Sequence, residues 1–590
     1  MKTVIEILNE IFMNAFEKSG FDKELGRVVV SNRPDLCQFQ CNGSMSGAKL
    51  YHKAPFMIAN DVVANIGEND IIADVSVVNP GFINIKIKDE FLSSYLYDMS
   101  KSENCGFSKV ENPKTVVIDF GGPNVAKPLH VGHLRSAVIG ESLKRMNKFV
   151  GNKVIGDAHL GDWGLQMGLI IHELSCRKPE LCYFDESFEG EYPAEAPFTL
   201  KDLEEIYPFA SAKSKEDEEY LAKARTATKE LQNGRAGYRA LWKHIMTVSL
   251  ADLKRNYARL DVDFDVWLGE SDSDSYIPDM VDMMKEKGFA YISDGALVVD
   301  VKEETDNSPI PPCIILKSDG SAIYETTDLA ALVQREQDYN PDRVVYVVDK
   351  RQGLHFERVF RCAKKTGVVK PNTELSFVGF GTVNGKDGKP FKTRSGGVMK
   401  LSELLDTVEE KVSIKDSETM SAEELQKLRS TIGLAAIKYG DLMNPCESNY
   451  IFDIDKFASF EGNTGPYILY TMVRIKSILA KISERYGDIM QDVNGSPFKA
   501  FTVNSERELA LSVSRFNHLI MDAVKKDAPS MICSYIYEIS NNFNAFYHDK
   551  KILAEENMDT LRSLVALISI TLKVLEEAIA LLGFSAPHKM

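Results

Sequence analysis

The chain has 590 residues, of which 44% are hydrophobic and 26% are charged, a composition typical of a soluble globular protein with three or four domains. Its formal net charge of −16 argues against a protein that binds nucleic acid non-specifically through a basic surface, but it is compatible with a local basic track. Nine scattered cysteines without a CxxC motif argue against a zinc finger and indicate reduced thiols in a cytoplasmic protein.

The first 110 residues predict a small α+β domain. Residues 1–20 follow an amphipathic helix pattern and lack the apolar run and cleavage site of a signal peptide. Residues 70–87 alternate in hydrophobicity around Asn79-Pro80-Gly81, which predicts two strands and a turn. The most apolar late stretch, residues 563–572, is too short for a membrane span of about 20 residues, so we expect no membrane association.

An α/β pattern begins near Lys114 and predicts a doubly wound, Rossmann-like sheet over residues 111–405. The expected order is strand, loop, helix and strand, at 115–120, 121–133, 134–150 and 153–160, with Gly151 as the helix stop. A charged, mainly helical stretch at about 170–305 indicates an insertion. The βα pattern then returns at 325–338, 343–349 and 375–381.

Everything from 406 to 590 is predicted to be helical. Ser421 and Glu424 form a capping box, and the last long helix ends at Gly583.

The loop AKPLHVGHLRS, residues 126–136, concentrates hydrogen-bonding and positive groups. It leaves a strand at the carboxyl edge of the sheet and enters a helix N-terminus, which favours anions. Gly132 would let a flat ring approach the backbone, His130 and His133 can donate to phosphate oxygens, and Lys127 adds a positive charge. These features suit a nucleoside triphosphate. An HxxH pair alone is more often two surface histidines, and its spacing does not fit the HExxH helix of a metalloprotease.

This loop resembles the HIGH motif of class I aminoacyl-tRNA synthetases. Nearly the whole chain is similar to the arginyl-tRNA synthetase family, through segments that follow in its order: QFQCNGSMSGAK, NPGFIN, PNVAKPLHVGHLRS, DAHLGDWGLQMG, LDVDFDVWLGES, SAIYETTDLAAL, YVVDKRQGLHF, GKDGKPFKTRSGG, SFEGNTGPYILY and NNFNAFYHDKKIL. The resemblance implies an additional tRNA-binding domain on the D-loop side (1–110), a class I catalytic domain (111–405) and a helical anticodon-binding domain (406–590).

The resemblance also implies a reaction. An arginine–tRNA ligase would use ATP, with Mg²⁺ but no evident protein site for it, to form arginyl-adenylate and pyrophosphate. It would then transfer arginine to the terminal 2′-hydroxyl of tRNA(Arg). The family further implies a cytoplasmic monomer that activates arginine only when tRNA is bound.

The nucleotide side is expected to include the catalytic residues His130, His133 and Lys127. Gly132, Gly161 and His355 are expected to bind ATP. The second class I signature, KMSKS, reads FKTRS at 391–395, so Phe391 takes the first lysine position and Arg394 the second. In relatives with such a departure, a lysine before the HIGH motif, here Lys127, is thought to supply the missing charge. Lys392 and Arg394 are expected helpers at ATP, with a solvated basic loop as the alternative.

The arginine pocket needs acceptors for a charged, five-donor guanidinium. Asp119 ends the first strand, and Tyr324 and Asp328 share one face of a helix start. Asp328 is expected to contact the guanidinium, with a helix N-cap as the alternative. The residues that the resemblance and the pattern assign to arginine are Asp119, Asn124, His159, Tyr324, Asp328 and Gln352. Asn124 and Gln352 are expected near the polar backbone groups of the amino acid, and His159 is equally a structural hydrogen bonder.

The tRNA side is expected on the terminal domains. Tyr467, Tyr470 and Arg474 share a helix face, for which a core stripe is the ordinary interpretation. The resemblance assigns them, with Tyr547 and Met590, to the anticodon loop, and it assigns Gln40 to the D-loop.

Three other classes compete with this interpretation. A catalytically silent paralog that binds tRNA would be free to lose His130, Gly132, His133 and Lys127, which are intact. A small nucleotidyltransferase of the same superfamily lacks a long helical C-terminal domain. A cysteinyl enzyme would have zinc ligands at the pocket.

Overall fold

The structure is a computed structural model that describes residues 1–389, 391, 399–414, 417–491 and 495–590. The chain forms two compact units. The terminal unit contains residues 1–109, 460–580 and 585–590, and the sheet unit contains residues 110–459 and 581–584. Residues 406–459, which we assigned to the helical domain, thus lie in the sheet unit. The domain limits drawn from the sequence stay predictions.

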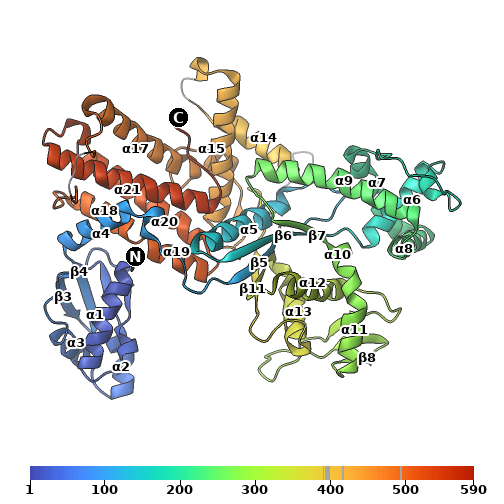
Figure 1. Ribbon diagram of the computed structural model, residues 1–590, viewed down its shortest axis with the longest axis horizontal. Helices are drawn as coiled ribbons and strands as arrows, with labels where there is room; N and C mark the ends of the chain where they lie inside the picture. The colour runs from blue at the N-terminus through green and yellow to red at the C-terminus, as the bar shows by residue number, and fades with distance from the viewer. Residues whose placement is uncertain (390, 392–398, 415–416, 492–494) are drawn as a thin grey trace. The chain divides into compact units, whose positions relative to one another are not determined.

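A five-stranded parallel sheet organises the sheet unit (Figure 1). Its order is β12-β11-β5-β6-β7, and every neighbouring pair is parallel. Three successive residues of β5, Val116, Val117 and Ile118, are at most 1% exposed, because a central parallel strand is covered on both faces. The strands are β5 (Thr115–Phe120), β6 (Lys153–Leu160), β7 (Val266–Gly269), β11 (Arg343–Asp349) and β12 (Glu374–Phe380). The predicted strand–helix–strand unit is confirmed.

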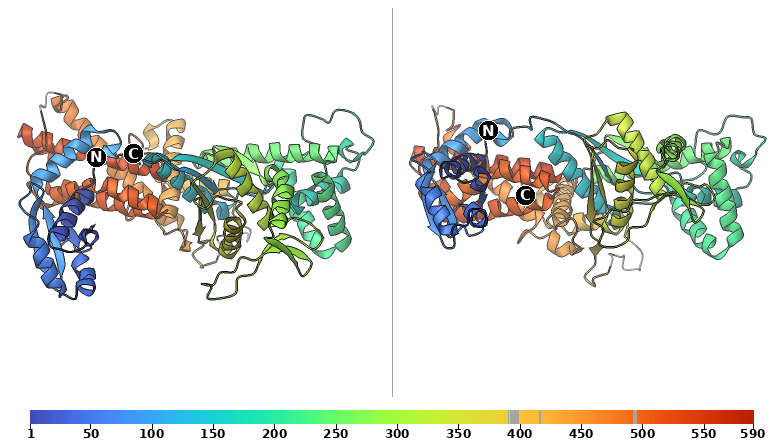
Figure 2. Two further views of the ribbon diagram at one scale, coloured as in Figure 1. Left: turned by 60° about the horizontal axis from the view of Figure 1, so that its bottom comes forward. Right: turned by 90° about the horizontal axis from the view of Figure 1, so that it is seen from below.

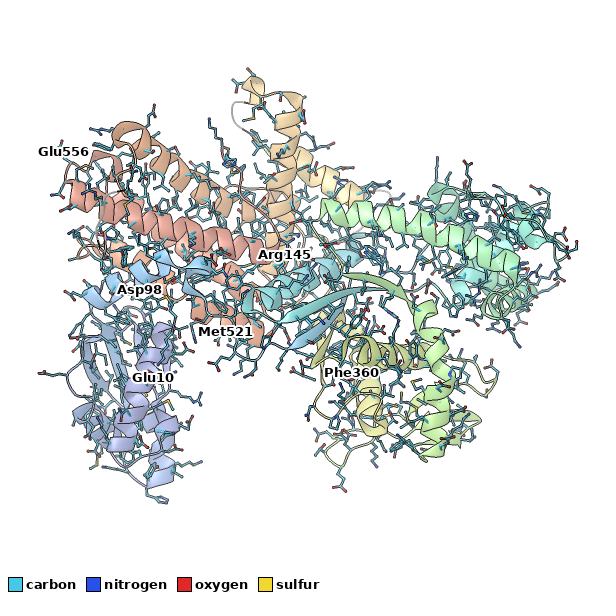
Figure 3. All side chains as sticks on the ribbon, viewed as in Figure 1. Glu10, Asp98, Arg145, Phe360, Met521 and Glu556 are labelled. Atoms are coloured by element: carbon cyan, nitrogen blue, oxygen red, sulfur yellow. The ribbon has the colours of Figure 1, made fainter. Side chains whose placement is uncertain are left out.

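Helices cover both faces of this sheet. Successive side chains of a strand point to opposite faces, so each strand packs against the helices on both sides. Phe120 of β5 packs so closely against Gly140 of α5 (Val131–Val150) that a Cβ there would lie 2.1 Å from the phenyl ring. Val117 points to the other face and packs in one cluster with α12 (Tyr324–Tyr339) and α13 (Gly353–Thr366). Phe360 of α13, labelled in Figure 3, lies 5.5 Å from the ring of Tyr346 on β11.

An inserted helical region separates β6 from β7. Its long helix α9 contacts the sheet at one end, where the Tyr257 hydroxyl donates to the carbonyl of Gly121. Helix α9 also packs against α6 and α8 of the insertion (Figure 2). The elements are α6 (Leu165–Arg177), η3 (Cys182–Phe184), α7 (Leu200–Glu216), α8 (Glu218–Gln232) and α9 (Ala236–Arg259).

Strand β7 corrects the sequence prediction, since it lies inside the range predicted as an insertion but forms the edge of the main sheet. It has four residues, three of them half-exposed, and it follows the charged stretch DVDFD. Its apolar run, residues 266–268, is shorter than the run of about four to eight residues by which a buried strand is recognised. A three-stranded antiparallel sheet follows, with the elements α10 (Glu270–Ser273), η4 (Asp274–Tyr276), α11 (Ile277–Glu286), β8 (Ala290–Ser293), β9 (Ala296–Val299) and β10 (Cys313–Leu316).

The last part of the sheet unit is mainly helical, with two short strands. The prediction that every element after 405 is helical is wrong, because β14 pairs in parallel with β13. A strand of two residues leaves no readable period in a sequence. The predicted capping box is confirmed: the Glu424 N–H donates to Ser421 Oγ (3.2 Å) and the Ser421 N–H donates to Glu424 Oε2 (2.9 Å). The elements are η5 (Lys350–Gln352), β13 (Val383–Asn384), α14 (Leu401–Lys411), η6 (Ser417–Thr419), α15 (Ala422–Leu442), β14 (Tyr450–Ile451) and α16 (Ile454–Phe457).

The terminal unit joins an α+β layer to a helical bundle. Its antiparallel sheet has the order β1-β2-β4-β3, and Arg507 of the bundle donates to the carbonyl of Ile87 (2.9 Å) and pairs with Asp89 (2.6 Å). The N-terminal elements are α1 (Val4–Lys18), η1 (Lys23–Gly26), β1 (Val28–Val30), β2 (Phe39–Cys41), α2 (Gly43–Tyr51), α3 (Pro55–Ala64), β3 (Ile72–Val78), β4 (Phe82–Ile87), α4 (Asp89–Lys101) and η2 (Glu103–Gly106). The C-terminal elements are α17 (Gly465–Tyr486), α18 (Asn504–Ser514), α19 (Phe516–Lys525), α20 (Pro529–Asp549), η7 (Ile552–Ala554) and α21 (Met558–Leu582). None of the helices in the described part of the chain is long and apolar enough to cross a membrane.

Candidate active site

The turn between β5 and α5 fixes the two histidines of the HIGH-like motif through backbone hydrogen bonds. His130 is the N-cap of α5, and its Nδ1 accepts from the Gly132 N–H at 3.0 Å. His133 Nδ1 accepts from the His130 N–H at 3.1 Å. Each neutral ring therefore carries its proton on Nε2, so both rings keep one N–H to donate.

Both histidines are held in the neutral form. Burial lowers the pKa of His133 to about 3, with the charges of His130 and Lys127 adding to the effect. Burial and Lys127 also lower the pKa of His130. The ring centroids lie 4.0 Å apart, so the turn offers a compact pair of uncharged donors.

Gly132 is exposed and lies directly beside His130. A Cβ at this position would lie 2.7 Å from Cε1 of the His130 ring. A larger residue would therefore displace the histidine. The glycine backbone leaves room for a flat ring to approach, as predicted from the sequence.

Lys127 follows a strained residue. Ala126 is fully buried and has φ +61°, a left-handed conformation that costs a non-glycine residue about 1–2 kcal/mol. Its N–H donates to Ser249 Oγ of α9 at 2.9 Å, which helps to hold this conformation. Lys127 Nζ lies over the ring of Tyr207 of α7, 4.2 Å from its centroid.

The segment before α14 lies on the same turn. The Val131 N–H donates to the Met399 carbonyl (3.1 Å) and the Leu401 N–H donates to the Leu129 carbonyl (2.9 Å). These bonds bring Lys400 beside His130. Lys392 and Arg394, which we expected to help at the phosphates, lie outside the described residues.

The carboxyl edge of the parallel sheet gathers most of the residues expected around arginine. Asp119 lies near the end of β5, His159 near the end of β6, and Gln352 ends η5 directly after β11. Asn124 forms a backbone bridge with Gly161 after β6, and its Oδ1 fills the space that a Cβ of Gly161 would need. Ligands bind at this edge in open parallel sheets.

Asp119 is already paired inside the protein. Its Oδ2 accepts from Arg335 Nη2 at 2.6 Å, and Asp157 Oδ2 accepts from the same nitrogen at 2.6 Å. Arg335 is 1% exposed and also donates to the Tyr346 hydroxyl at 3.0 Å. Burial raises the pKa of Asp119, and the charge of Arg335 opposes that rise. One guanidinium thus pairs with both carboxylates at this edge.

Replacing Arg335 with methionine should lower the free energy of unfolding by about 3–5 kcal/mol, because it leaves two buried carboxylates without their cation. Arg361→Met is the matched control: Arg361 also pairs with more than one carboxylate, Asp306 (2.8 Å), Glu357 (2.6 Å) and Glu303 (3.8 Å), but its side chain is 18% exposed. The control should cost about 1 kcal/mol. Urea denaturation at neutral pH measures both, and equal losses would contradict the assignment of Arg335 as the buried counter-ion.

Asp328 lies in the first turns of α12, where it pairs with a histidine. His355 Nε2 lies 2.5 Å from Asp328 Oδ2, and His355 Nδ1 lies 3.8 Å from Glu325 Oε1. Burial lowers the pKa of His355, but hydrogen bonds to Asp328 and Glu325 outweigh it and raise the pKa to about 9. The N-cap of α12 is Ile323, so the N-cap interpretation of Asp328 is wrong. His355, expected on the nucleotide side, is thus the cation that faces Asp328.

Glu270 is a site residue that the sequence did not reveal. It follows β7 at the same edge of the sheet and begins α10. Burial and the charges of Asp162 and Asp328 raise its pKa to about 7, while His159 opposes the rise. Tyr324, the first residue of α12, is 74% exposed, and partial burial, Glu270 and Tyr207 raise its pKa. The signal was an acid, Glu270, directly after the strand that ends at Gly269, but that strand was counted as part of the insertion.

Within the described residues, no group of three or more His, Cys, Asp or Glu side chains is placed to hold a metal ion.

The terminal unit brings four of the predicted tRNA residues into one cluster on α17 and α20. Arg474 lies over the rings of Tyr470 (4.8 Å) and Tyr547 (5.6 Å), and it donates to Asn544 Oδ1 at 2.6 Å. The Tyr467 hydroxyl accepts from Asn544 Nδ2 at 2.9 Å. Tyr470 is 42% exposed and the others are half-buried, so the core interpretation of this stripe is wrong. The sequence did not single out Asn544, whose amide joins the two helices.

The other two predicted tRNA residues lie elsewhere in that unit. Gln40 is on β2 and donates to Asn84 Oδ1 of β4 at 2.8 Å. Met590 is the last residue of the chain and is half-buried.

Three family descriptions match successive parts of the chain. Residues 2–87 match "Arginyl tRNA synthetase N terminal domain", residues 97–454 match "tRNA synthetases class I (R), catalytic domain", and residues 468–590 match "DALR anticodon binding domain". The chain belongs to the arginyl-tRNA synthetase family. The family and the fold class predicted from the motifs are confirmed.

Curated and solved relatives of this family member span its whole length. The chain is 56% identical to the arginine–tRNA ligase of Agathobacter rectalis and 54% identical to that of Alkaliphilus oremlandii, with 100% of both chains covered in each case. Its fold is similar to the crystal structure of arginyl-tRNA synthetase from Plasmodium falciparum, with a TM-score of 0.82, 26% identity and 100% of both chains covered. The Thermus thermophilus arginyl-tRNA synthetase shares the fold at a TM-score of 0.78 and 19% identity, with 99% of this chain and 100% of that chain covered.

Proposed function

We propose that this arginyl-tRNA synthetase family member is an arginine–tRNA ligase that uses ATP to join L-arginine to its tRNA. One observation carries the proposal. The acidic cluster that contains Asp119 lies at the end of strand β5. The chain then enters the turn that holds two neutral histidine donors. A cationic amino acid and an anionic triphosphate would therefore meet at one edge of the sheet.

The nucleotide side works by positioning and charge stabilisation. His130 and His133 donate Nε2–H to phosphate oxygens, Lys127 supplies positive charge, and the adenosine lies over Gly132 and near Gly161. A carboxylate oxygen of arginine bonds to the α-phosphorus, and the bond to the β-phosphate bridging oxygen breaks. The electron pair of that bond leaves with pyrophosphate. No protein nucleophile is required, because fixed donors stabilise the developing charge.

The arginine side pairs a guanidinium with acids. Asp328, Glu270 and Tyr324 face the guanidinium, while Asn124, Gln352 and Asp119 hold the amino and carboxylate groups, with His159 beside them. His355 uses Asp328 Oδ2, so Oδ1 is the oxygen for the substrate. A bound cation also lowers the pKa of Glu270 from about 7 and keeps this acid ionised.

The second step joins arginine to RNA. The oxygen of the terminal 2′-hydroxyl of tRNA(Arg) forms a bond to the acyl carbon, and the bond from that carbon to the adenylate phosphate oxygen breaks. AMP leaves with the electron pair, and the hydroxyl proton passes to solvent. Tyr467, Tyr470, Arg474 and Tyr547 offer rings and a guanidinium on which unpaired anticodon bases can stack. Gln40 contacts the D-loop and Met590 the anticodon loop.

Four further properties rest on the family resemblance. Mg²⁺ arrives with ATP, arginine activation needs bound tRNA, and the chain works as a monomer in the cytoplasm. The nine free cysteines fit a reducing compartment.

Arg474→Ala should raise KM for tRNA(Arg) in charging by about tenfold, the loss expected when one base loses its stacking partner. Arg485→Ala on the same helix is the control, since Arg485 also lies over a tyrosine, Tyr486 at 4.8 Å. The control should change KM by less than about twofold. Steady-state charging of purified tRNA(Arg) measures both variants, and equal KM values for the two would contradict the anticodon role.

Charging of total tRNA with each radiolabelled amino acid tests the proposed function. Arginine alone should be attached. A folded chain that binds tRNA but charges it with no amino acid would favour the silent paralog, and charging with another amino acid would refute the pocket.

A further inference from the structure

Helix α7 of the insertion presents one face to two lysines that lie beside His130, one on the catalytic turn and one before α14. Lys127 Nζ lies 4.2 Å from the centre of the Tyr207 ring, and Lys400 Nζ lies 2.7 Å from Glu204 Oε2. Residues 204 and 207 are one helical turn apart and share a face. Lys127 and Lys400 lie on the two chain segments that run past His130, so one helix contacts both segments.

The Tyr207 ring is fixed by the fold of the insertion. It packs against a buried cluster of Leu169 from α6, Ala210 from α7, and Tyr220 and Ala224 from α8. The exposed fractions of these four residues are 5% or less. The ring is therefore a rigid platform, whereas a free lysine side chain has about 2 kcal/mol of rotamer entropy to lose.

The backbone of Lys127 is also held by the insertion. The strained Ala126 that precedes it donates its N–H to Ser249 of α9 at 2.9 Å. Two inserted helices thus act on one residue: α9 fixes the backbone direction before Lys127, and α7 fixes where its ammonium lies.

We propose that Tyr207 is a positioning residue for Lys127, whose ammonium it holds against its ring face beside the triphosphate. The inserted region thereby contributes to the chemistry through Lys127. The inference rests on the proposed role of Lys127, and the Glu204–Lys400 pair steadies the same helix face against the turn.

Tyr207 variants in ATP–pyrophosphate exchange test this proposal. With the full chain, arginine and tRNA present, Tyr207→Leu should lower kcat by about tenfold, the loss expected for one partly desolvated cation–π contact. Tyr207→Phe keeps the ring face and should stay within about twofold. Tyr207→Met is the second non-aromatic variant should leucine prevent folding. Phe209→Leu on the same helix is the control, because Phe209 lies over Arg177 and Lys213 instead, and it should leave exchange unchanged.

A double-mutant cycle with Lys127→Met separates positioning from general structure. Tyr207→Leu should cause almost no further loss in the Lys127→Met background, because the group it positions is gone. An equal loss in both backgrounds, or a Tyr207→Phe variant as slow as Tyr207→Leu, would overturn the proposal while the role of Lys127 stands. Full activity of Lys127→Met alone would instead refute the role of Lys127 and the inference with it.

Discussion

Replacing Asp328 with asparagine should lower kcat/KM for arginine by about a thousandfold, the order expected when one partner of a desolvated charge pair is removed. The Asp328 carboxylate now neutralises the His355 cation. An amide in its place would leave the substrate guanidinium facing an uncompensated positive charge. The loss should fall on arginine and leave KM for ATP within about threefold, because Asp328 lies on α12 rather than on the histidine turn.

The matched control is Asp338→Asn, an exposed acid near the other end of α12. It should leave kcat/KM for arginine unchanged. An NMR titration gives a second readout, since the pKa of His355 should fall from about 9 when its hydrogen bond to the Asp328 carboxylate is lost. A loss below about tenfold in kcat/KM, with the control unchanged, would place the guanidinium elsewhere.

Replacing His133 with alanine should lower kcat for adenylate formation by about 10²–10³-fold, the usual loss when one preorganised donor to transition-state charge is removed. The Nε2–H of this buried neutral ring is held in place by the bond from the His130 N–H to Nδ1. KM for arginine should stay within about twofold, because the donor acts on the phosphates.

His172→Ala serves as the control for this experiment. His172 lies on α6 and contacts Tyr220 within the insertion, so its loss should leave the rate of adenylate formation unchanged. Single-turnover formation of adenylate measures both variants. A His133→Ala enzyme that keeps more than about a tenth of the rate would contradict the donor role.

Local signals were sufficient to predict the catalytic strand–turn–helix. Strand β5 is a continuous apolar run, α5 has a readable helical period, and Gly151 takes the left-handed conformation (φ +103°) expected of a helix stop. The histidine turn could be assigned for the same reason, since all its parts lie within a few residues of one another.

Long-range pairs could not be predicted from patterns. Arg335 joins Asp119 and Asp157 across 216 and 178 positions, and no periodicity specifies which buried guanidinium meets which carboxylate. His355 was expected on the nucleotide side, and its pairing with Asp328, which comes from a different helix, left no signal in the sequence. Glu270 was missed because β7 is too short, and follows too charged a stretch, to be recognised as part of the main sheet.

The distribution of charge within the site matches the charges of the two substrates, although the chain as a whole is acidic. The arginine side carries an excess of carboxylate, and the turn next to it carries neutral histidines and Lys127. The two substrates have opposite charges, so each is attracted to its own side of one sheet edge.

ATP–pyrophosphate exchange with each of the twenty amino acids, with and without tRNA, tests the central claim most directly. The account predicts exchange with arginine alone and only when tRNA is present. Exchange with a different amino acid would contradict the acidic pocket of Asp328, Glu270 and Tyr324. No exchange under any condition, from folded chain that still binds tRNA, would contradict the ligase itself.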